Sequence, residues 1–200
     1  MFPLESVLFP SAVLALHVFE PRYSELTRQA LADDREFGVT LIERGSEVGG
    51  GDARFGIGTR AQIVQATELS DGRWALLAVG LRRIAVVRWL PDDPFPQAEV
   101  DDVLEAEPGP GVEALQEPAE RLLRRTLALR AELGEPAAPP TIELADDPAT
   151  AAFQMGALAP VGPADAQRVL EAASTEERLL VLAHLLEEQA EVLEARVSGA

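Results

Sequence analysis

The stretch HVFEPRYSELTRQAL, residues 17–31, places a histidine, a glutamate, an arginine and a tyrosine within seven positions. Such a group of side chains is found in active sites, but it is also typical of the junction between a strand and a helix. Proline is favoured in the first turn of a helix, and a carboxylate just before that turn meets the positive helix end. We therefore expect Pro21 to begin a helix and Glu20 to offer its carboxylate to the free N–H groups.

The residues that follow Pro21 have the spacing of an amphipathic helix. One face is formed, at positions i, i+3, i+4, i+7 and i+8, by Tyr23, Leu26, Thr27, Ala30 and Leu31. Arg22 lies off this face, and we expect it to pair with Glu20 or with an acid of a neighbouring loop. Phe19 is expected to end the preceding strand and to pack the turn against the sheet. The local pattern favours a structural junction over a catalytic group.

The rest of the first half has the pattern of short strands. Apolar runs and alternation predict strands at residues 12–19, 37–44, 56–69, 73–80, 81–90 and 97–103. The dipeptide Asp71-Gly72 between two of these runs predicts a hairpin, because glycine accepts the positive φ of a tight turn. Short, mostly antiparallel strands with one early helix predict a curled sheet or a partly open barrel.

Helical spacing replaces the strand pattern after EAEPGPGVEA, residues 105–114. It predicts helices at residues 112–133, 148–158 and 163–173, and a final long helix after Ser174. Asp147 suits an N-cap, and Ser174 with Glu177 has the spacing of a capping box.

These patterns together predict an α+β protein in two parts. Residues 1–108 are expected to form a curled, mostly antiparallel sheet or pseudobarrel with one early helix, and residues 109–200 a helical bundle. No apolar stretch approaches the roughly 20 residues that cross a bilayer as a helix.

The composition excludes several kinds of chemistry. All 17 basic residues are arginines, and the 200 residues contain no lysine and no cysteine. Without lysine there is no Walker A phosphate loop, no Ser–Lys dyad and no Schiff base. Without cysteine there is no disulfide, no thiol nucleophile and no Cys-based metal or iron–sulfur site. We expect no cofactor and no metal.

The formal net charge of −17 bears on the partners. Proteins that bind nucleic acid or anionic membranes do so with basic side chains, which an acidic surface does not provide. We expect neither as a partner and ascribe most of the charge to solubility. The start MFPLESVLFP has no early basic residue and carries Glu5, which argues against a secretory signal. A cytoplasmic location is expected.

Two patterns with functional meaning elsewhere are better explained as structure. GIGTRA, residues 56–61, fits the dinucleotide fingerprint GxGxxA, but that motif opens a helix, whereas the residues here alternate like a strand. His17 and His184 are far apart, and no metal-ligand spacing such as HExxH occurs. A hydrolase site around His17 stays an alternative, which requires a carboxylate and a hydroxyl within hydrogen-bond reach.

Several segments follow one another in a specific order: FPLESVLFPSAVLALHVFEPRYSELTRQAL, FGVTLI, GTRAQI, DGRWALLAVGLRRIAVV and AEV, and in the helical half LAPVGPADAQRVLEAASTEERLLVLAHLLEEQAEVLEAR. This order resembles the N-terminal substrate-recognition domain of Lon proteases. The resemblance covers nearly all 200 residues, and the Phe-Glu-Pro-Arg-Tyr junction is among its most characteristic parts. It implies a PUA-like curled β-subdomain, followed by a helical part, of a bacterial type.

The resemblance also implies a function. In Lon proteases this domain gathers unfolded or tagged protein substrates, and ATPase and Ser–Lys protease modules follow it. This chain ends at Ala200 without a lysine, so we expect a stand-alone, non-catalytic module that binds proteins or peptides. Its expected partners are unfolded or peptide segments and a protease or chaperone system, and the long final helix could pair with another copy in a homo-oligomer.

The expected contacts cluster where the strand meets the helix: His17, Phe19, Glu20, Arg22 and Tyr23. Besides the hydrolase at His17, RNA binding through the PUA-like relationship is a third hypothesis. The net charge of −17 disfavours it.

Overall fold

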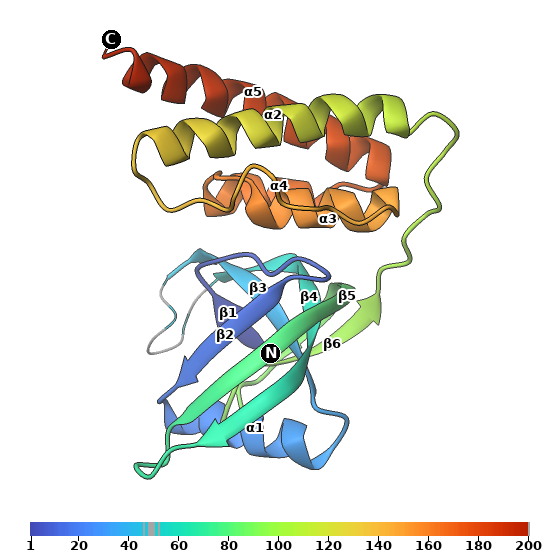
Figure 1. The fold of residues 1–200 in the computed structure, drawn as a ribbon. Helices are drawn as coiled ribbons and strands as arrows, with labels where there is room; N and C mark the ends of the chain where they lie inside the picture. The colour runs from blue at the N-terminus through green and yellow to red at the C-terminus, as the bar shows by residue number, and fades with distance from the viewer. Residues whose placement is uncertain (46, 48–50, 52, 200) are drawn as a thin grey trace. The chain divides into compact units, whose positions relative to one another are not determined.

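The computed structural model describes residues 1–45, 47, 51 and 53–199. Its elements, in chain order, are β1 (Phe2–Leu4), β2 (Val13–Val18), α1 (Pro21–Ala32), β3 (Glu36–Arg44), β4 (Ala53–Glu68), β5 (Trp74–Leu90), β6 (Gln97–Asp102), α2 (Glu113–Glu132), α3 (Pro148–Leu158), α4 (Pro163–Glu171) and α5 (Thr175–Val197). The chain divides into two compact units, Met1–Leu104 and Glu105–Ala200. The strands and α1 belong to the first unit, and the other helices to the second (Figure 1). The predicted α+β class is confirmed.

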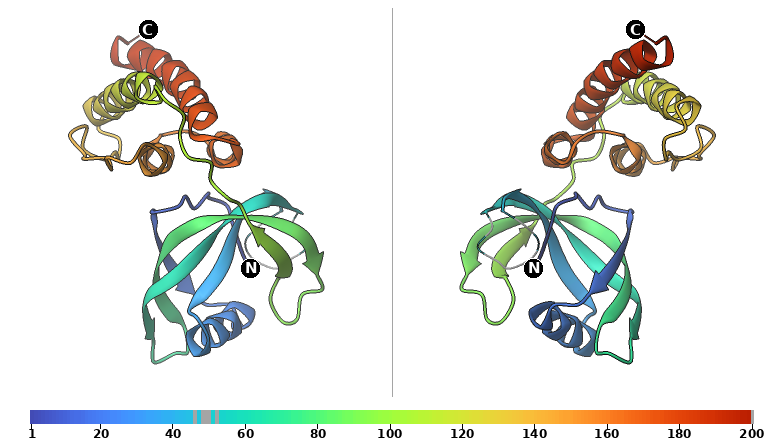
Figure 2. Two further views of the ribbon diagram at one scale, coloured as in Figure 1. Left: turned by 90° about the vertical axis from the view of Figure 1, so that its right-hand side faces the viewer. Right: turned by 90° about the vertical axis from the view of Figure 1, so that its left-hand side faces the viewer.

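The first unit is built on one curled sheet (Figure 2). Within the described residues the strand order is β1-β3-β4-β5-β2, and β6 also pairs with β5. Neighbours are antiparallel, except that β1 runs parallel to β3. The long strand β5 serves two partners, because β2 pairs with residues 74–79 and β6 with residues 84–90.

The two end strands of this order, β1 and β2, each leave one edge without a partner strand in the part of the chain that the structure describes. Both strands nevertheless contribute to the hydrophobic core, since Phe2, Leu4 and Val18 are buried. Helix α1 adds Tyr23 and Leu26 to the same core. The junction predicted at residues 17–31 is thus where an edge strand passes into the helix that packs on the core.

The sheet differs from the sequence prediction at two places. Strand β1 was not predicted, because three residues are too short to show an alternation. The predicted strands 73–80 and 81–90 are one continuous strand, β5, with Gly80 inside it. A Cβ on Gly80 would meet the Phe9 carbonyl oxygen. Gly80 therefore marks a close backbone approach rather than a turn.

The helical unit is organised by α2 and α5. Leu123 and Leu127 of α2 are buried, as are Leu182 and Leu186 of α5. The Thr126 hydroxyl lies 3.4 Å from the Leu186 carbonyl oxygen and so joins the two helices. This apolar packing is what the periodicity of both segments predicted.

The helix caps predicted at Asp147 and Ser174 are confirmed. The Asp147 carboxylate accepts hydrogen bonds from Thr150 N at 2.8 Å and Thr150 Oγ1 at 2.6 Å, and these bonds hold the pKa of Asp147 below its usual range. The Ser174 hydroxyl accepts from Glu177 N at 3.2 Å. The Glu177 carboxylate turns back to Ala173 N at 2.7 Å, one residue before the position of a standard capping box.

The predicted boundary after residue 108 and the division of the structure after Leu104 lie close together. Glu105 lies 3.5 Å from Arg178, and Gly109 N donates to the Glu176 carboxylate at 2.5 Å. These contacts join the first residues after Leu104 to the helical unit. No helix in the described ranges is long and apolar enough to span a bilayer.

Candidate functional site

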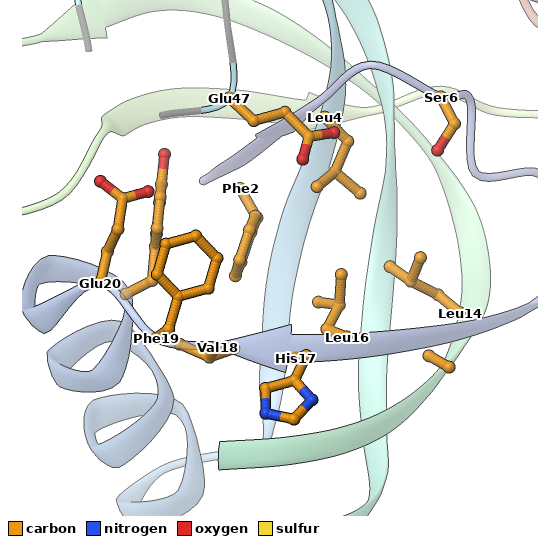
Figure 3. Close-up of a pocket in the computed structure, with 12 residues that line it drawn as sticks. Phe2, Leu4, Ser6, Leu14, Leu16, His17, Val18, Phe19, Glu20 and Glu47 are labelled. Carbon is orange, nitrogen blue, oxygen red and sulfur yellow. The ribbon is translucent and has the colours of Figure 1, made fainter. Parts of the chain in front are cut away.

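The β unit contains a cavity of about 300 Å³ lined by residues of β1 and β2, the start of α1, and Glu47 (Figure 3). We call it the β1–β2 cavity. Its apolar lining is contributed by Phe2 and Leu4 of β1 and by Leu14, Leu16 and Val18 of β2. Polar residues, among them Ser6, Glu20 and Glu47, line the rest of it, and a concave site with both apolar and polar groups is a common form of binding site in proteins.

The alternation of β2 decides which of its side chains reach the cavity. Successive side chains of a strand point to opposite faces. Leu14 and Leu16 are half-buried, Val18 is buried, and the residues between them are exposed. Figure 3 shows the His17 ring on the opposite side of β2 from Leu14 and Leu16. The imidazole therefore faces away from the apolar side of the strand.

Stacked aromatic rings hold β1 against α1. The ring centroids of Phe2 and Tyr23 are 4.2 Å apart, and the ring planes differ by 13°. Phe37 of β3 adds a tilted contact with Phe2, at 6.1 Å between centroids. Tyr23 is 3% exposed, so it supports the cavity as a core residue.

Arg22 braces the entrance to α1. Its Nε donates to the Glu20 carboxylate at 3.2 Å, and its Nη2 donates to the Glu47 carbonyl oxygen at 3.3 Å. The guanidinium carbon lies 4.5 Å from the centroid of the Tyr23 ring. Through these contacts Arg22 joins the start of α1 to the segment that carries Glu47. The predicted pairing with Glu20 is confirmed.

The exposed apolar surface and the charge of the cavity come from three further lining residues: Phe19, Glu20 and Glu47. Phe19 is 58% exposed, an unusual state for an aromatic side chain. The Glu47 carboxylate accepts a hydrogen bond from Glu5 N at 2.5 Å. With Arg22 the two carboxylates carry a net charge of −1, so this end of the cavity is weakly acidic.

Two local expectations for the junction are wrong. Phe19 does not pack the turn against the sheet, because its ring is largely exposed. Glu20 occupies the N-cap position of α1 without capping it through its side chain. Its carboxylate is held by Arg22 instead. The carboxylate thus has a charged partner two residues away in place of the N–H groups of the helix start.

Four of the five residues expected as contacts, namely His17, Phe19, Glu20 and Tyr23, line the β1–β2 cavity. Arg22 does not line it but holds two of its parts together. Sequence reasoning missed Phe2, Leu4 and Glu47, which also line it. No sequence signal identifies them, since Phe2 and Leu4 take their places through the pairing of β1 with β3, and Glu47 is distant in sequence from the other lining residues.

The hydrolase hypothesis requires partners for His17. Among the described residues, no hydrogen bond or ion pair to this side chain is found, and the imidazole is exposed. In the same part of the chain, no group of three or more His, Asp or Glu side chains is placed to hold a metal ion. A nucleophile–base pair at His17 has no geometric support within the residues that the structure describes.

The GxGxxA pattern lies inside β4, as the alternation predicted. A Cβ on Gly58 would meet the Val39 carbonyl oxygen of the neighbouring strand. A Cβ on Gly56 would meet nothing. The second glycine is thus explained by the close approach of β3, and the dinucleotide interpretation is not needed.

Comparison with known proteins identifies the family of the chain. The model of the ATP-dependent protease La (LON) substrate-binding domain matches residues 1–188. The chain is 31% identical to Lon protease 2 of Myxococcus xanthus over 191 residues, and 28% identical to the Lon protease of Anaeromyxobacter dehalogenans over the same length. These alignments cover 94% of this chain but 23% and 22% of those proteins. The chain therefore spans less than a quarter of the length of these two relatives.

Two solved structures are similar to this fold. A Lon N-terminal domain protein from Xanthomonas campestris superposes with a TM-score of 0.64 and 27% identity, over 90% of this chain and 92% of that one. The N-terminal domain of a Mycobacterium avium complex Lon protease gives a TM-score of 0.69 over 92% and 95% of the two chains. At 21% identity, the second match supports the fold alone.

Proposed function

The chain belongs to the LON substrate-binding domain family, and from this premise we propose that it binds segments of other polypeptides in the β1–β2 cavity without chemical conversion. Relatives that match it along nearly its whole length are proteases, but the matched part is the substrate-binding portion. The absence of lysine from its 200 residues is consistent with a role that needs no P-loop or Ser–Lys chemistry.

The observation that carries the proposal is the exposed Phe19 beside a cavity that has an apolar wall. Phe19 is 58% exposed, and Phe2, Leu14 and Leu16 line the cavity next to it. Folded proteins bury most large apolar side chains, whereas unfolded segments expose them. An apolar side chain of such a segment would leave water by entering the cavity and by contacting the Phe19 ring. The stabilisation scales with the apolar area removed from water.

The charges near the cavity restrict the class of segment. Glu20 and Glu47 line it, and the whole chain carries a net charge of −17. An acidic segment would be repelled, whereas a segment with basic residues next to its apolar ones would be attracted. The same charge disfavours RNA, and none of the described residues that line the cavity is an arginine, the residue that would bind phosphates here.

The wider setting of the chain stays a prediction. We expect that it serves a cytoplasmic proteolytic or chaperone system, by analogy with its relatives. Self-association through α5 is also proposed, since Leu180 and Val192 of that helix are 57% and 55% exposed. Sedimentation analysis of the purified chain tests whether it self-associates.

A binding titration tests the main proposal. The probe is a fluorescently labelled, unstructured peptide with alternating apolar residues and an arginine at each end. We expect saturable binding, weakened about tenfold by Phe19→Ala, which corresponds to roughly 1.4 kcal/mol. Val87→Ala is the matched control, because Val87 is 59% exposed on β5 and does not line the cavity.

Two results would contradict the proposal. One is the absence of binding at high peptide concentration while the protein is folded. The other is an equal loss of affinity in Phe19→Ala and Val87→Ala, which would place the binding surface elsewhere.

A further inference from the structure

We propose that the bound segment adds to the sheet as a strand, paired through its main chain with the open edge of β2. This inference rests on the proposed function and specifies how that function is carried out. It commits to one occupant, an extended segment of an unfolded protein with apolar residues at alternate positions and a basic residue beside them.

The first observation is that β2 is an unpartnered edge. It pairs with β5 on one side, in unbroken register from Val13↔Val79 to Val18↔Trp74. In the ranges that the structure describes, no strand pairs with its other side. A strand edge with free N–H and C=O groups is a template for another extended chain.

The second observation concerns which residues of β2 direct their N–H and C=O groups to β5 and which direct them to the open edge. Gly80 N donates to Ala12 O at 2.9 Å, which fixes the alternation of the ladder just before β2 begins. Residues 14, 16 and 18 therefore direct their N–H and C=O groups to β5. Residues 13, 15 and 17 direct theirs to the open edge.

The direction of these N–H and C=O groups explains why two residues with exposed side chains line the cavity. Ala15 and His17 line it, although both are exposed and the His17 ring lies on the far side of β2 in Figure 3. What these two residues present to the cavity is main chain. The β1–β2 cavity thus offers hydrogen-bonding groups from β2 beside the apolar side chains of Leu14 and Leu16. An extended peptide requires both, since it forms main-chain bonds on one side and places alternate side chains in pockets.

The third observation is the lack of protection along this edge. Exposed edge strands are usually blocked by charged side chains, by proline or by a bulge. The sequence of β2 is VLALHV, with no proline and no Asp, Glu, Lys or Arg. Its ladder with β5 has no register shift. Nothing in β2 itself prevents the addition of a strand.

Charge selects an unfolded segment over a second copy of this chain as the occupant. At this edge a second copy would bring the acidic Glu20 and Glu47 of one cavity towards those of the other, and like charges repel. Glu20 and Glu47 at the cavity instead favour a segment with a basic residue. A dimer formed through two β2 edges is therefore an outcome that the test must detect.

The test compares three versions of one labelled peptide of about six residues, a common strand length. The first has unmodified amides. The second and third carry the same number of N-methyl groups on the two alternate sets of amides. In a paired strand only one set of N–H groups faces β2. We expect one methylated peptide to bind at least about tenfold more weakly than the unmodified peptide, and the other to keep its affinity within about threefold.

Hydrogen exchange of the full chain supplies the second readout. With the unmodified peptide bound, the amides of Ala15 and His17 should gain protection. The amides of Leu14 and Leu16 are already bonded to β5 and should change little.

The outcomes separate the two proposals. Equal tolerance of both methylated peptides, or binding without protection at Ala15 and His17, would overturn strand addition and leave the proposed function standing. Failure of the unmodified peptide to bind would overturn both. Protection of Ala15 and His17 in a dimer without peptide would show that a second copy occupies the edge, and would overturn the assignment to an unfolded segment.

Discussion

The ring of Phe2 lies stacked on the ring of Tyr23, with 4.2 Å between the centroids and 13° between the planes. The contact joins the strand that begins the chain to the helix that follows the Glu20-Pro21 step. Both residues line the β1–β2 cavity, and both are buried in the core. The cavity is therefore supported by the same packing that stabilises the unit, while Phe19 beside it is largely exposed.

Tyr23→Ala should destabilise the β unit. It removes a ring that is 3% exposed and leaves Phe2 without its stacking partner. We expect a loss of about 3–5 kcal/mol in the free energy of unfolding. Trp74 and Trp89 both lie in β5, so urea unfolding followed by tryptophan fluorescence reports on this unit. Tyr23→Phe keeps the ring and should retain most of the stability. An equal loss in both variants would show that the stacked ring is not the stabilising feature.

The two glycines of the GIG tripeptide should respond differently to the same change. Gly58→Ala places a methyl group against the Val39 carbonyl oxygen and should cost about 1–3 kcal/mol of stability. Gly56→Ala meets nothing within 4 Å and should change stability by less than about 0.5 kcal/mol. Denaturant midpoints of both variants check this. Equal midpoints would contradict the close approach of β3 to Gly58.

Arg178 should be essential to the helical unit. Its side chain is fully buried, and it donates from Nε to the Val169 carbonyl oxygen at 3.3 Å and from Nη2 to the Ala172 carbonyl oxygen at 3.2 Å. The guanidinium carbon lies 3.8 Å from the centroid of the Phe153 ring. Arg178→Met leaves the two carbonyl groups without this donor. We expect the free energy of unfolding to fall by about 3 kcal/mol.

The control for this change is Arg168→Met. The Arg168 side chain is 57% exposed and pairs with Asp165, one helical turn away, at 3.0 Å. Such pairs contribute little, so the variant should stay within about 0.5 kcal/mol of the unmodified chain. Thermal unfolding followed by far-UV circular dichroism compares the two. If Arg168→Met lost as much stability as Arg178→Met, the claim that the buried arginine stabilises the helical unit more than the exposed one would be wrong.

The junction between the units should be the first site of proteolysis. Leu104 is 90% exposed, and residues 103–109 form neither helix nor strand. Limited digestion should give two resistant fragments whose ends fall within this segment, which mass spectrometry identifies. This also tests the predicted boundary after residue 108. Cleavage inside β5 or α5 before the junction would contradict the division into two units.

Much of the fold could be predicted because its signals are local. Alternation located β2 and β4, proline and acid patterns located the start of α1, and capping residues located α3 and α5. Gly72 in the predicted hairpin has a φ of +82°, as a tight turn requires. These features depend on a few neighbouring residues, and the sequence displays them directly.

The parts that could not be predicted depend on contacts between distant residues. Strand β1 exists through its parallel pairing with β3, in which Phe2 faces Val39. Glu47, beyond the end of β3, lines the cavity beside residues of β1 and β2 that are distant in sequence. The exposure of Phe19 was also missed, since an aromatic residue at a strand end is more often packed. The strand–helix junction located the candidate site in the sequence. The apolar residues that line the rest of the cavity were found only in the structure.

The central claim is that polypeptide segments bind in the β1–β2 cavity of this chain. The most direct measurement is the change in backbone amide chemical shifts when the unmodified peptide is titrated into the isotopically labelled chain. We predict saturable changes concentrated in residues 2–6 and 13–20 and at Glu47. Saturable changes confined to residues 105–199, with the cavity amides unmoved, would contradict the claim.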